Sequence, residues 1–223
     1  VCGEGVDGAI VADFGQGMLT SAVLSRLTKR LRGVTGVLVG DVSGRRSTLR
    51  AMKGMDLVCP SEQELRDAYA QHDDSLPSIT WQMLHETDTR YAMVTMGAEG
   101  LIAFDRLPPG ATERDQAWQG RLGATHVPSM SPMAVDPLGC GDALIATATL
   151  TLASGGSFRA ASFLGSIAAA TQAQRVGNIP VSSTDLRQGV NRVHAAHLAF
   201  AVPDVLDARQ AREPGSSSPA ALA

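Results

Sequence analysis

Short apolar runs that end in an acidic residue alternate with helical patterns through the first half of this chain. Residues 7–13 and 36–41 each form such a run, closing at Asp13 and Asp41, as is typical of buried strands. Between them, residues 20–31 place apolar side chains at helical spacing and finish in basic residues. A helix between two strands favours parallel pairing, because parallel strands need a long crossover connection. The pattern therefore predicts an α/β fold: a three-layer α/β/α sandwich around a mainly parallel central sheet.

The same two patterns continue toward residue 200, with one long interruption. They predict strands at 55–59, 91–95 and 100–104, the last two as a hairpin, and helices at 61–69, 77–87, 141–152, 157–174 and 184–200. Residues 105–122, rich in proline, glycine and charge, predict an exposed loop. The composition of residues 203–223 is typical of a disordered tail, which leaves 1–202 as the folded domain.

Composition excludes several classes of function. With 44% hydrophobic residues among 223 and a formal charge of −3, the chain can build a core but has no basic excess, so we expect no nucleic-acid partner. No apolar run approaches the ~20 residues that span a bilayer, so we expect no membrane association. The odd set Cys2, Cys59 and Cys140 favours neither disulfides nor zinc and favours the cytoplasm. Because the chain opens at Val1, we expect it to be a piece of a longer protein.

The segment from Val135 to Asp142 carries the strongest chemical signal. Glycines at 139 and 141 allow a tight turn that points several backbone N–H groups at one spot, directly before a predicted helix. Such a turn binds an anion, above all a phosphate that gains charge in a transition state. Asp142, in the first helical turn, stays ionised and can accept a proton from an alcohol. The alternative is structural: Asp142 caps the helix and the glycines only turn the chain.

Four segments, in this order, resemble the ribokinase-like carbohydrate kinases of the PfkB family. Residues 59–64 (CPSEQE) resemble its T-P-N-x-x-E segment, residues 94–100 (VTMGAEG) its V-T-x-G-x-x-G loop, residues 136–142 (DPLGCGD) its D-x-x-G-A-G-D signature, and residues 168–170 its alanine-rich helix. Two further segments, 13–17 (DFGQG) and 41–44 (DVSG), are similar to segments of one branch, the heptose-7-phosphate kinases. The resemblance thus implies the ribokinase-like fold.

The resemblance also implies a role for each matching position. Asp142 would be the catalytic base, and the backbone amides of Gly139, Cys140 and Gly141 would hold the γ-phosphate of ATP. The nucleotide would be bound by residues of the other segments: Ser61, Thr95, Gly97, Gly100 and Ala169. Glu64 would hold Mg²⁺ through water, as suits a cation that keeps its hydration shell. Asp136 would belong to a monovalent-cation site, with K⁺ as the candidate ion.

The chain departs from the family pattern in two respects. Ser61 stands where the family usually has Asn, and Gln16 and Ser43 replace lysines of the heptose-kinase segments. Arg45 and Arg46 could restore the lost positive charge, the alternative being solvated charges at a helix start. The resemblance further implies that roughly ninety residues are missing before residue 1, an extent judged from ordinary domain size. They would hold amino-terminal strands and a β-lid, which bind the sugar and through which many relatives form homodimers.

Together these features predict an ATP-dependent kinase that phosphorylates a hydroxyl of a sugar or sugar phosphate, with heptose 7-phosphate as one candidate acceptor. Two alternatives stay open. The chain could be a non-catalytic nucleotide-binding remnant or interaction module that kept the fold without the sugar half. It could also be a hydrolase whose nucleophile is Cys140, activated by a lowered pKa at a helix N-terminus, with His126 as its base.

Overall fold

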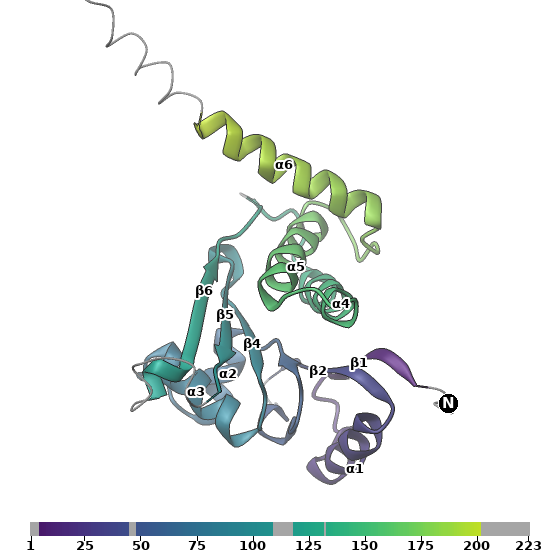
Figure 1. The fold of residues 1–223 in the computed structure, drawn as a ribbon, viewed down its shortest axis with the longest axis vertical. Helices are drawn as coiled ribbons and strands as arrows, with labels where there is room; N and C mark the ends of the chain where they lie inside the picture. Colours follow the sequence, from purple (N-terminus) through teal and green to yellow (C-terminus); the bar gives the residue numbers. More distant parts are fainter. Residues whose placement is uncertain (1–4, 45–47, 109–117, 132, 202–223) are drawn as a thin grey trace, which may run out of the picture.

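A single six-stranded sheet organises the chain. The computed structural model describes residues 5–44, 48–108, 118–131 and 133–201. Its strands follow each other across the sheet in chain order (Figure 1): β1 (Val6–Asp13), β2 (Thr35–Val42), β3 (Leu57–Val58), β4 (Tyr91–Thr95), β5 (Leu101–Arg106) and β6 (Leu122–Val127). The pairs from β1 to β4 are parallel, whereas β4–β5 and β5–β6 are antiparallel. The predicted mainly parallel sheet is therefore confirmed, with an antiparallel extension at one side.

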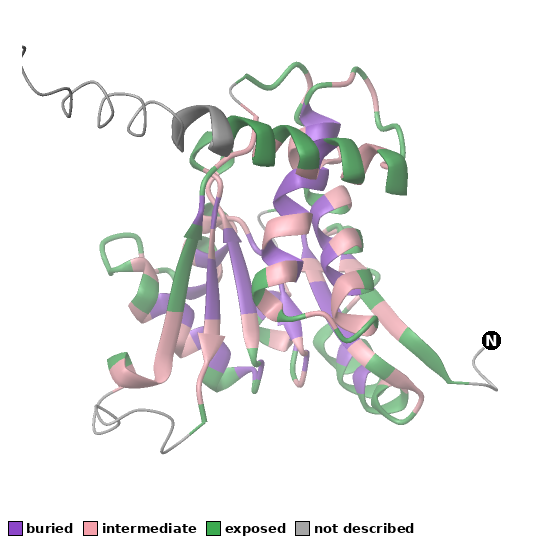
Figure 2. Cartoon of the chain, turned by 45° about the horizontal axis from the view of Figure 1, so that its top comes forward, coloured by how far each residue is buried: buried purple, intermediate pink, exposed green. Residues whose placement is uncertain are grey.

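Helices cover both faces of this sheet. One layer contains α1 (Ser21–Arg32), α2 (Glu62–Tyr69) and α3 (Leu76–Glu86), and the other contains α4 (Cys140–Ala153) and α5 (Phe158–Ala173), against which α6 (Ser183–Ala201) packs. Successive strand residues point to opposite layers. Thus Leu38 of β2 belongs to the core under α1–α3, and its neighbour Val39 to the core under α4 and α5. Figure 2 shows this burial running through both layers, while α6 stays largely exposed.

The predicted helices are confirmed, with ends that agree to within a few residues. The start of α2 is the most sharply determined, because Ser61 and Glu64 form a capping box in which each side chain accepts a hydrogen bond from the backbone N–H of the other residue. Within the described part of the chain, no helix is both long and apolar enough to cross a membrane.

The prediction for residues 105–122 was wrong at both ends. Asp105 and Arg106 complete β5, and residues 118–121 form a short 3₁₀ helix that leads into β6. Strand β6 was not predicted because it lacks the alternation of buried and exposed residues that marks a strand: its residues 124–126 are exposed and only Val127 is buried. The strand expected at 55–59 is shorter, since only Leu57 and Val58 pair. Arg45, Arg46, Cys2 and the tail 203–223 lie outside the described residues.

Candidate active site

Four side chains reach one edge of the sheet, where the parallel strands end. Asp13 and Thr95 close β1 and β4, Asp41 lies one residue from the end of β2, and Cys59 follows β3. Asp13 has a structural task there, because its carboxylate accepts hydrogen bonds from the N–H of Gly15 (3.0 Å) and the hydroxyl of Thr48 (2.6 Å). Ligands of such sheets bind at this edge. Cys59 is buried in the core under α4 and α5, which leaves Asp41 and Thr95 as the groups available for chemistry.

The amino end of α4 also lies at this edge. Gly139 precedes the helix with φ 78° and ψ 3°, a left-handed conformation that favours glycine. A Cβ at Gly139 would lie 2.8 Å from Cγ of Asn178, so the turn packs tightly against the loop after α5. Ala143 N–H donates to the Gly139 carbonyl (2.9 Å), while Cys140 N–H donates to the Pro137 carbonyl (3.2 Å). The first N–H groups of a helix lack helical partners, but that of Cys140 is already engaged within the turn.

A cavity of about 310 Å³ opens beside this helix end. The β4–β5 turn contributes one wall with Thr95, Gly97 and Gly100, the first turn of α4 contributes Cys140 and Gly141, and α5 contributes small alanines, among them Ala169. Three segments far apart in the sequence therefore line one space. These six residues include most of the positions expected to bind the nucleotide and its phosphates.

Gly100 is the point at which the β4–β5 turn approaches the end of β6. Its backbone has φ 92° and ψ −131°, a region that only glycine readily adopts. A Cβ there would lie 2.6 Å from both the carbonyl carbon of Pro128 and the amide nitrogen of Ser129, and closer still to the carbonyl oxygen of Val127. All three are backbone atoms, so a side chain cannot be accommodated by a rotamer change. The absence of a side chain at residue 100 thus lets this wall of the cavity close.

Three carboxylates concentrate negative charge near the end of β2. Burial, and then the charges of Asp142 and Glu64, raise the pKa of Asp41 from its ordinary 3.8 to about 6. Glu64 is held in place, because one carboxylate oxygen accepts the N–H and the hydroxyl of Ser61 (both 2.8 Å) and the other accepts the N–H of Gly44 (3.2 Å). No three His, Cys, Asp or Glu side chains of the described residues lie close enough to hold a metal ion by themselves. A divalent cation here would need water or substrate oxygens as further ligands.

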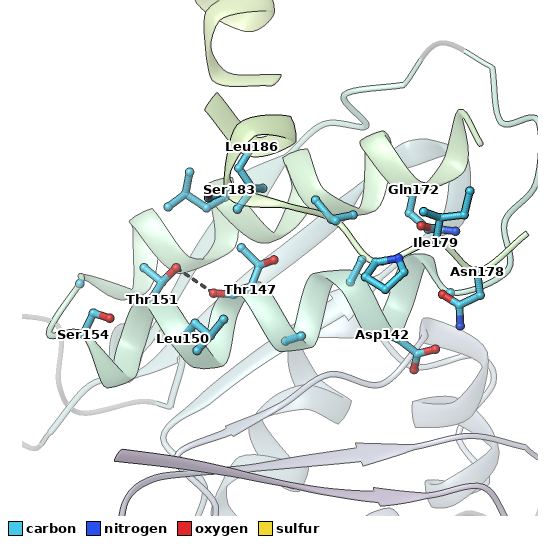
Figure 3. Close-up of a pocket in the computed structure, with 17 residues that line it drawn as sticks. Asp142, Thr147, Leu150, Thr151, Ser154, Gln172, Asn178, Ile179, Ser183 and Leu186 are labelled. Carbon is cyan, nitrogen blue, oxygen red and sulfur yellow. Dashed lines mark hydrogen bonds between the residues drawn. The ribbon is translucent and has the colours of Figure 1, made fainter. Parts of the chain in front are cut away.

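Asp142 and Gly139 line a second, larger cavity of about 650 Å³. It runs along the outer side of α4 and is closed by the loop after α5 and the first turn of α6. Figure 3 shows Asp142 and Asn178 at one end of it, with Leu150 and Thr151 farther along α4. The first turn of α4 therefore separates the two cavities, with the amide-bearing backbone of Gly141 on one side and the carboxylate of Asp142 on the other. Ser61, Glu64 and Asp136 line neither cavity.

The surroundings of Cys140 argue against the cysteine-hydrolase alternative. Burial, and secondarily the negative charge of Asp136, raise the pKa of the Cys140 thiol above its ordinary value of 9. A thiol nucleophile needs the opposite shift. His126, the proposed base, has its Nε2 atom 2.9 Å from the carbonyl oxygen of Glu99. The cysteine-hydrolase alternative needs a lowered Cys140 pKa, whereas desolvation and the neighbouring carboxylate shift it the other way.

Two residues of this region were missed from the sequence. Gln172 is buried in α5 and donates hydrogen bonds to the carbonyls of Leu138 and Gly177, and Asn178 packs against Gly139. Neither residue belongs to a motif. The only signal in the sequence is a polar side chain at the end of an alanine-rich apolar helix, for Gln172, or shortly after it, for Asn178. Asp41 was recognised as a strand-end acid, but its coupling to Asp142 and Glu64 depends on the packing of α4 and α2 onto the sheet.

Comparison with known proteins places this chain in a family. Residues 22–185 match the pfkB family of carbohydrate kinases. The chain is 26% identical over 201 residues to the bifunctional protein HldE of Azorhizobium caulinodans and 27% identical over 190 residues to that of Methylobacillus flagellatus. These alignments cover 90% and 84% of the chain but only 38% and 36% of the relatives. The chain thus spans little more than a third of the length of these curated proteins.

Solved structures show the same fold. Phosphofructokinase-2 from Escherichia coli, in complex with potassium, aligns with a TM-score of 0.64 at 16% identity, covering 81% of this chain and 55% of that one. Ribokinase from Arabidopsis thaliana, complexed with ribose and ATP, aligns with a TM-score of 0.62 at 15% identity, covering 82% and 55%. The ribokinase-like architecture expected from the motifs is confirmed. Because the family match extends over well more than half of its residues, this chain belongs to the pfkB family of carbohydrate kinases.

Proposed function

We propose that this chain is a kinase that transfers the terminal phosphoryl group of ATP to a hydroxyl of a sugar or sugar phosphate. The observation that carries the proposal is the convergence of three distant segments at the amino end of α4. One cavity is lined by Thr95, Gly97, Gly100, Cys140, Gly141 and Ala169, and Asp142, the residue after Gly141, lines the neighbouring cavity across the first turn of α4. A cavity for the nucleotide, a helix N-terminus and an adjacent carboxylate are the parts that alcohol phosphorylation requires.

ATP would occupy the 310 Å³ cavity with its base against the alanines of α5 and its phosphates toward the first turn of α4. Helix N-termini bind phosphate through N–H groups and the positive end of the helix dipole. The N–H of Cys140 contributes only if it leaves the Pro137 carbonyl, so the amides of Gly141 and Asp142 are the first available donors. Both lie in the first turn of α4, and donors held in place by a helix cost little rearrangement during the reaction.

Asp142 would act as the base. Its carboxylate takes the proton of the acceptor hydroxyl as that oxygen bonds to the γ-phosphorus, and the bond from phosphorus to the bridging oxygen of ADP breaks. ADP leaves with the bonding electron pair, and the proton remains on Asp142 until it is lost to solvent. The reaction thus takes place beside the negative charges of Asp41 and Glu64. Positioning and electrostatic stabilisation carry most of the rate enhancement in such transfers.

The residues present fit Mg²⁺. Burial, and then the negative charges of Asp142 and Glu64, raise the pKa of Asp41, so a cation bound beside these three carboxylates would offset their mutual repulsion. Carboxylates and water are the ligands that Mg²⁺ prefers. Glu64, oriented by Ser61, and Asp41 would hold the ion mainly through water. Bound there, Mg²⁺ supplies positive charge to the phosphate oxygens of ATP.

A phosphorylated sugar is the acceptor class we favour. The matches to proteins named HldE cover 90% and 84% of this chain, and the segments at Asp13 and Asp41 resemble those of heptose-7-phosphate kinases. Heptose 7-phosphate is therefore the first acceptor to test. Because the matches cover little more than a third of those relatives, the substrates of the whole protein are inferred from this portion alone.

The test is transfer of label from γ-labelled ATP to a panel of sugars and sugar phosphates. We expect Asp142→Asn to lower the transfer rate by about 10²–10⁴-fold, the usual contribution of a general base, with ATP affinity within threefold of the unsubstituted chain. Asp67→Asn, an exposed carboxylate on α2, is the matched control and should retain the full rate. Equal rates in Asp142→Asn and the control would refute the assignment of the base. ATP binding without transfer to any acceptor would instead favour the non-catalytic remnant.

A further inference from the structure

The side chain of Gln172 joins the loop before α4 to the loop after α5. The first of these loops leads into residues 139–141, the turn that we propose binds phosphate and call the phosphate-binding turn. Only 1% of Gln172 is exposed, in the last turn of α5. Its Nε2 atom donates to the carbonyl oxygens of Leu138 (3.1 Å) and Gly177 (2.7 Å). Because both partners are carbonyl oxygens, the group between them must be the NH₂ end of the amide, which has two hydrogens to give. Figure 3 shows Gln172 beside the loop that carries Asn178 and Ile179.

Asp136 binds the other polar groups of the same two residues. One carboxylate oxygen accepts the N–H of Leu138 (2.9 Å) and the other accepts the N–H of Gly177 (3.0 Å). These two hydrogen bonds hold the pKa of Asp136 below its usual value, so it stays ionised. Leu138 and Gly177 thus each make two of these hydrogen bonds: the backbone N–H donates to the Asp136 carboxylate, and the backbone carbonyl accepts from Gln172. Leu138 directly precedes Gly139, so this closed set of four hydrogen bonds fixes the start of α4.

A monovalent cation does not fit this arrangement. Carboxylate and carbonyl oxygens are the ligands that such an ion takes from a protein, and Asp136, Leu138 and Gly177 present them together. All of them already accept N–H donors. The Gly177 carbonyl accepts a second hydrogen bond, from Ile179 N–H (3.1 Å), so both of its lone pairs are engaged. The expectation that Asp136 belongs to a K⁺ site therefore disagrees with the residues present, although E. coli phosphofructokinase-2, of the same fold, has been solved in complex with potassium.

We propose that the Gln172 amide takes the place of a monovalent cation between the Leu138 and Gly177 carbonyls, so that the phosphate-binding turn keeps its shape without K⁺. A cation would attract both carbonyl oxygens and the Asp136 carboxylate to one point. The Gln172 amide holds the two carbonyl oxygens together in the same way, with directed hydrogen bonds and no net charge. Gln172 is accordingly a positioning residue that acts through Leu138 and Gly139.

The first test needs no nucleotide and is independent of the proposed function. Thermal unfolding of the chain is compared in KCl, NaCl and choline chloride at equal ionic strength. We expect the same melting temperature in all three. A K⁺-specific rise that saturates with concentration would overturn the proposal, because it would show that the ion binds despite Gln172.

Variants test whether the amide is the group responsible. Gln172→Met keeps the length of the side chain but leaves two buried carbonyls without a donor, and we expect a melting temperature lower by about 3–10 °C. Gln174→Met, two residues later and exposed, is the matched control and should change little. In Gln172→Ala, which frees the oxygens, we expect K⁺ but not choline to restore part of the lost stability. Equal stability of the two Met variants, or no K⁺ response in Gln172→Ala, would contradict the proposal.

A final readout rests on the proposed function. If the loops position the phosphate-binding turn, Gln172→Met should weaken the binding of Mg-ATP at least tenfold and leave the binding of adenosine, which lacks phosphates, within threefold. An equal loss for both ligands would indicate general disruption and refute the positioning role. If neither ligand binds the unsubstituted chain, the proposed function fails, while the ion and stability measurements still decide the role of Gln172.

Discussion

Replacing Gly100 by alanine separates two physical demands on the β4–β5 turn, and Gly97 in the same turn provides the comparison. At Gly100, a Cβ meets the backbone of residues 127–129 and φ is 92°. At Gly97, φ is 59° but an added Cβ would have no atom within 4 Å. Gly97→Ala therefore incurs only left-handed strain, about 1–2 kcal/mol. Gly100→Ala incurs about 1–3 kcal/mol of strain and a further 1–3 kcal/mol, roughly, for displacing packed backbone.

We expect Gly100→Ala to lower the free energy of unfolding by about 2–6 kcal/mol, with a central value of about 4 kcal/mol, against about 1–2 kcal/mol for Gly97→Ala. That is a large share of the roughly 5–15 kcal/mol that holds a domain together. Urea unfolding followed by circular dichroism measures the difference, and an m-value of about 2 kcal/mol/M converts it to a midpoint gap of about 1–2 M. Equal losses in the two variants, or a larger loss at Gly97, would refute the close approach of the turn to β6.

Three further predictions concern the charges and caps of the site. The pKa of Asp41 is raised to about 6, so between about pH 4 and 6 the folded chain keeps a proton there that the unfolded chain has lost, and stability falls as the pH rises through this range. Asp41→Asn should therefore be more stable than the unsubstituted chain at pH 8 but not at pH 4. An equal difference in urea unfolding at both pH values would contradict this. Ser61→Ala should lower the unfolding free energy by about 1 kcal/mol through loss of the α2 cap, whereas Ser61→Asn, which can still cap, should not, and equal losses would show that the cap is not responsible. Because the pKa of Cys140 is raised, iodoacetamide at pH 8 should alkylate its thiol more slowly than it alkylates the thiol of glutathione. Mass spectrometry of the Cys140 peptide measures the rate, and alkylation faster than that of glutathione would support Cys140 as a nucleophile.

The sequence predicted those parts of the fold whose signals are local. The α2 capping box needs only Ser61 and Glu64 at the correct spacing, and the β1–α1–β2 unit needs only apolar periodicity. Strand β6 was not predicted because pairing with β5 holds it in the sheet, while its own middle residues face solvent. Pairing with an existing edge, rather than intrinsic pattern, makes this segment a strand.

The candidate site divides in the same way. Gly139, Gly141 and Asp142 were singled out from a seven-residue segment, because a tight turn before a helix depends on consecutive residues. Gln172 was not found, because its role depends on Leu138 and Gly177, which the fold brings beside it. The nucleophile alternative for Cys140 could not be judged from the sequence for a related reason: the sequence shows the helix end, but not the burial and the Asp136 charge that raise the pKa of the thiol.

The most direct measurement of the central claim is a calorimetric titration of the chain with Mg-ATP, comparing Ala169→Leu with Ala195→Leu. Ala169 lines the 310 Å³ cavity, whereas Ala195 is an exposed residue of α6. The added side chain at residue 169 would fill part of the space assigned to the nucleotide. The account predicts one ATP site, weakened at least tenfold in Ala169→Leu and unchanged in Ala195→Leu. Equal affinity in the two variants would show that the nucleotide binds elsewhere and contradict the proposed site.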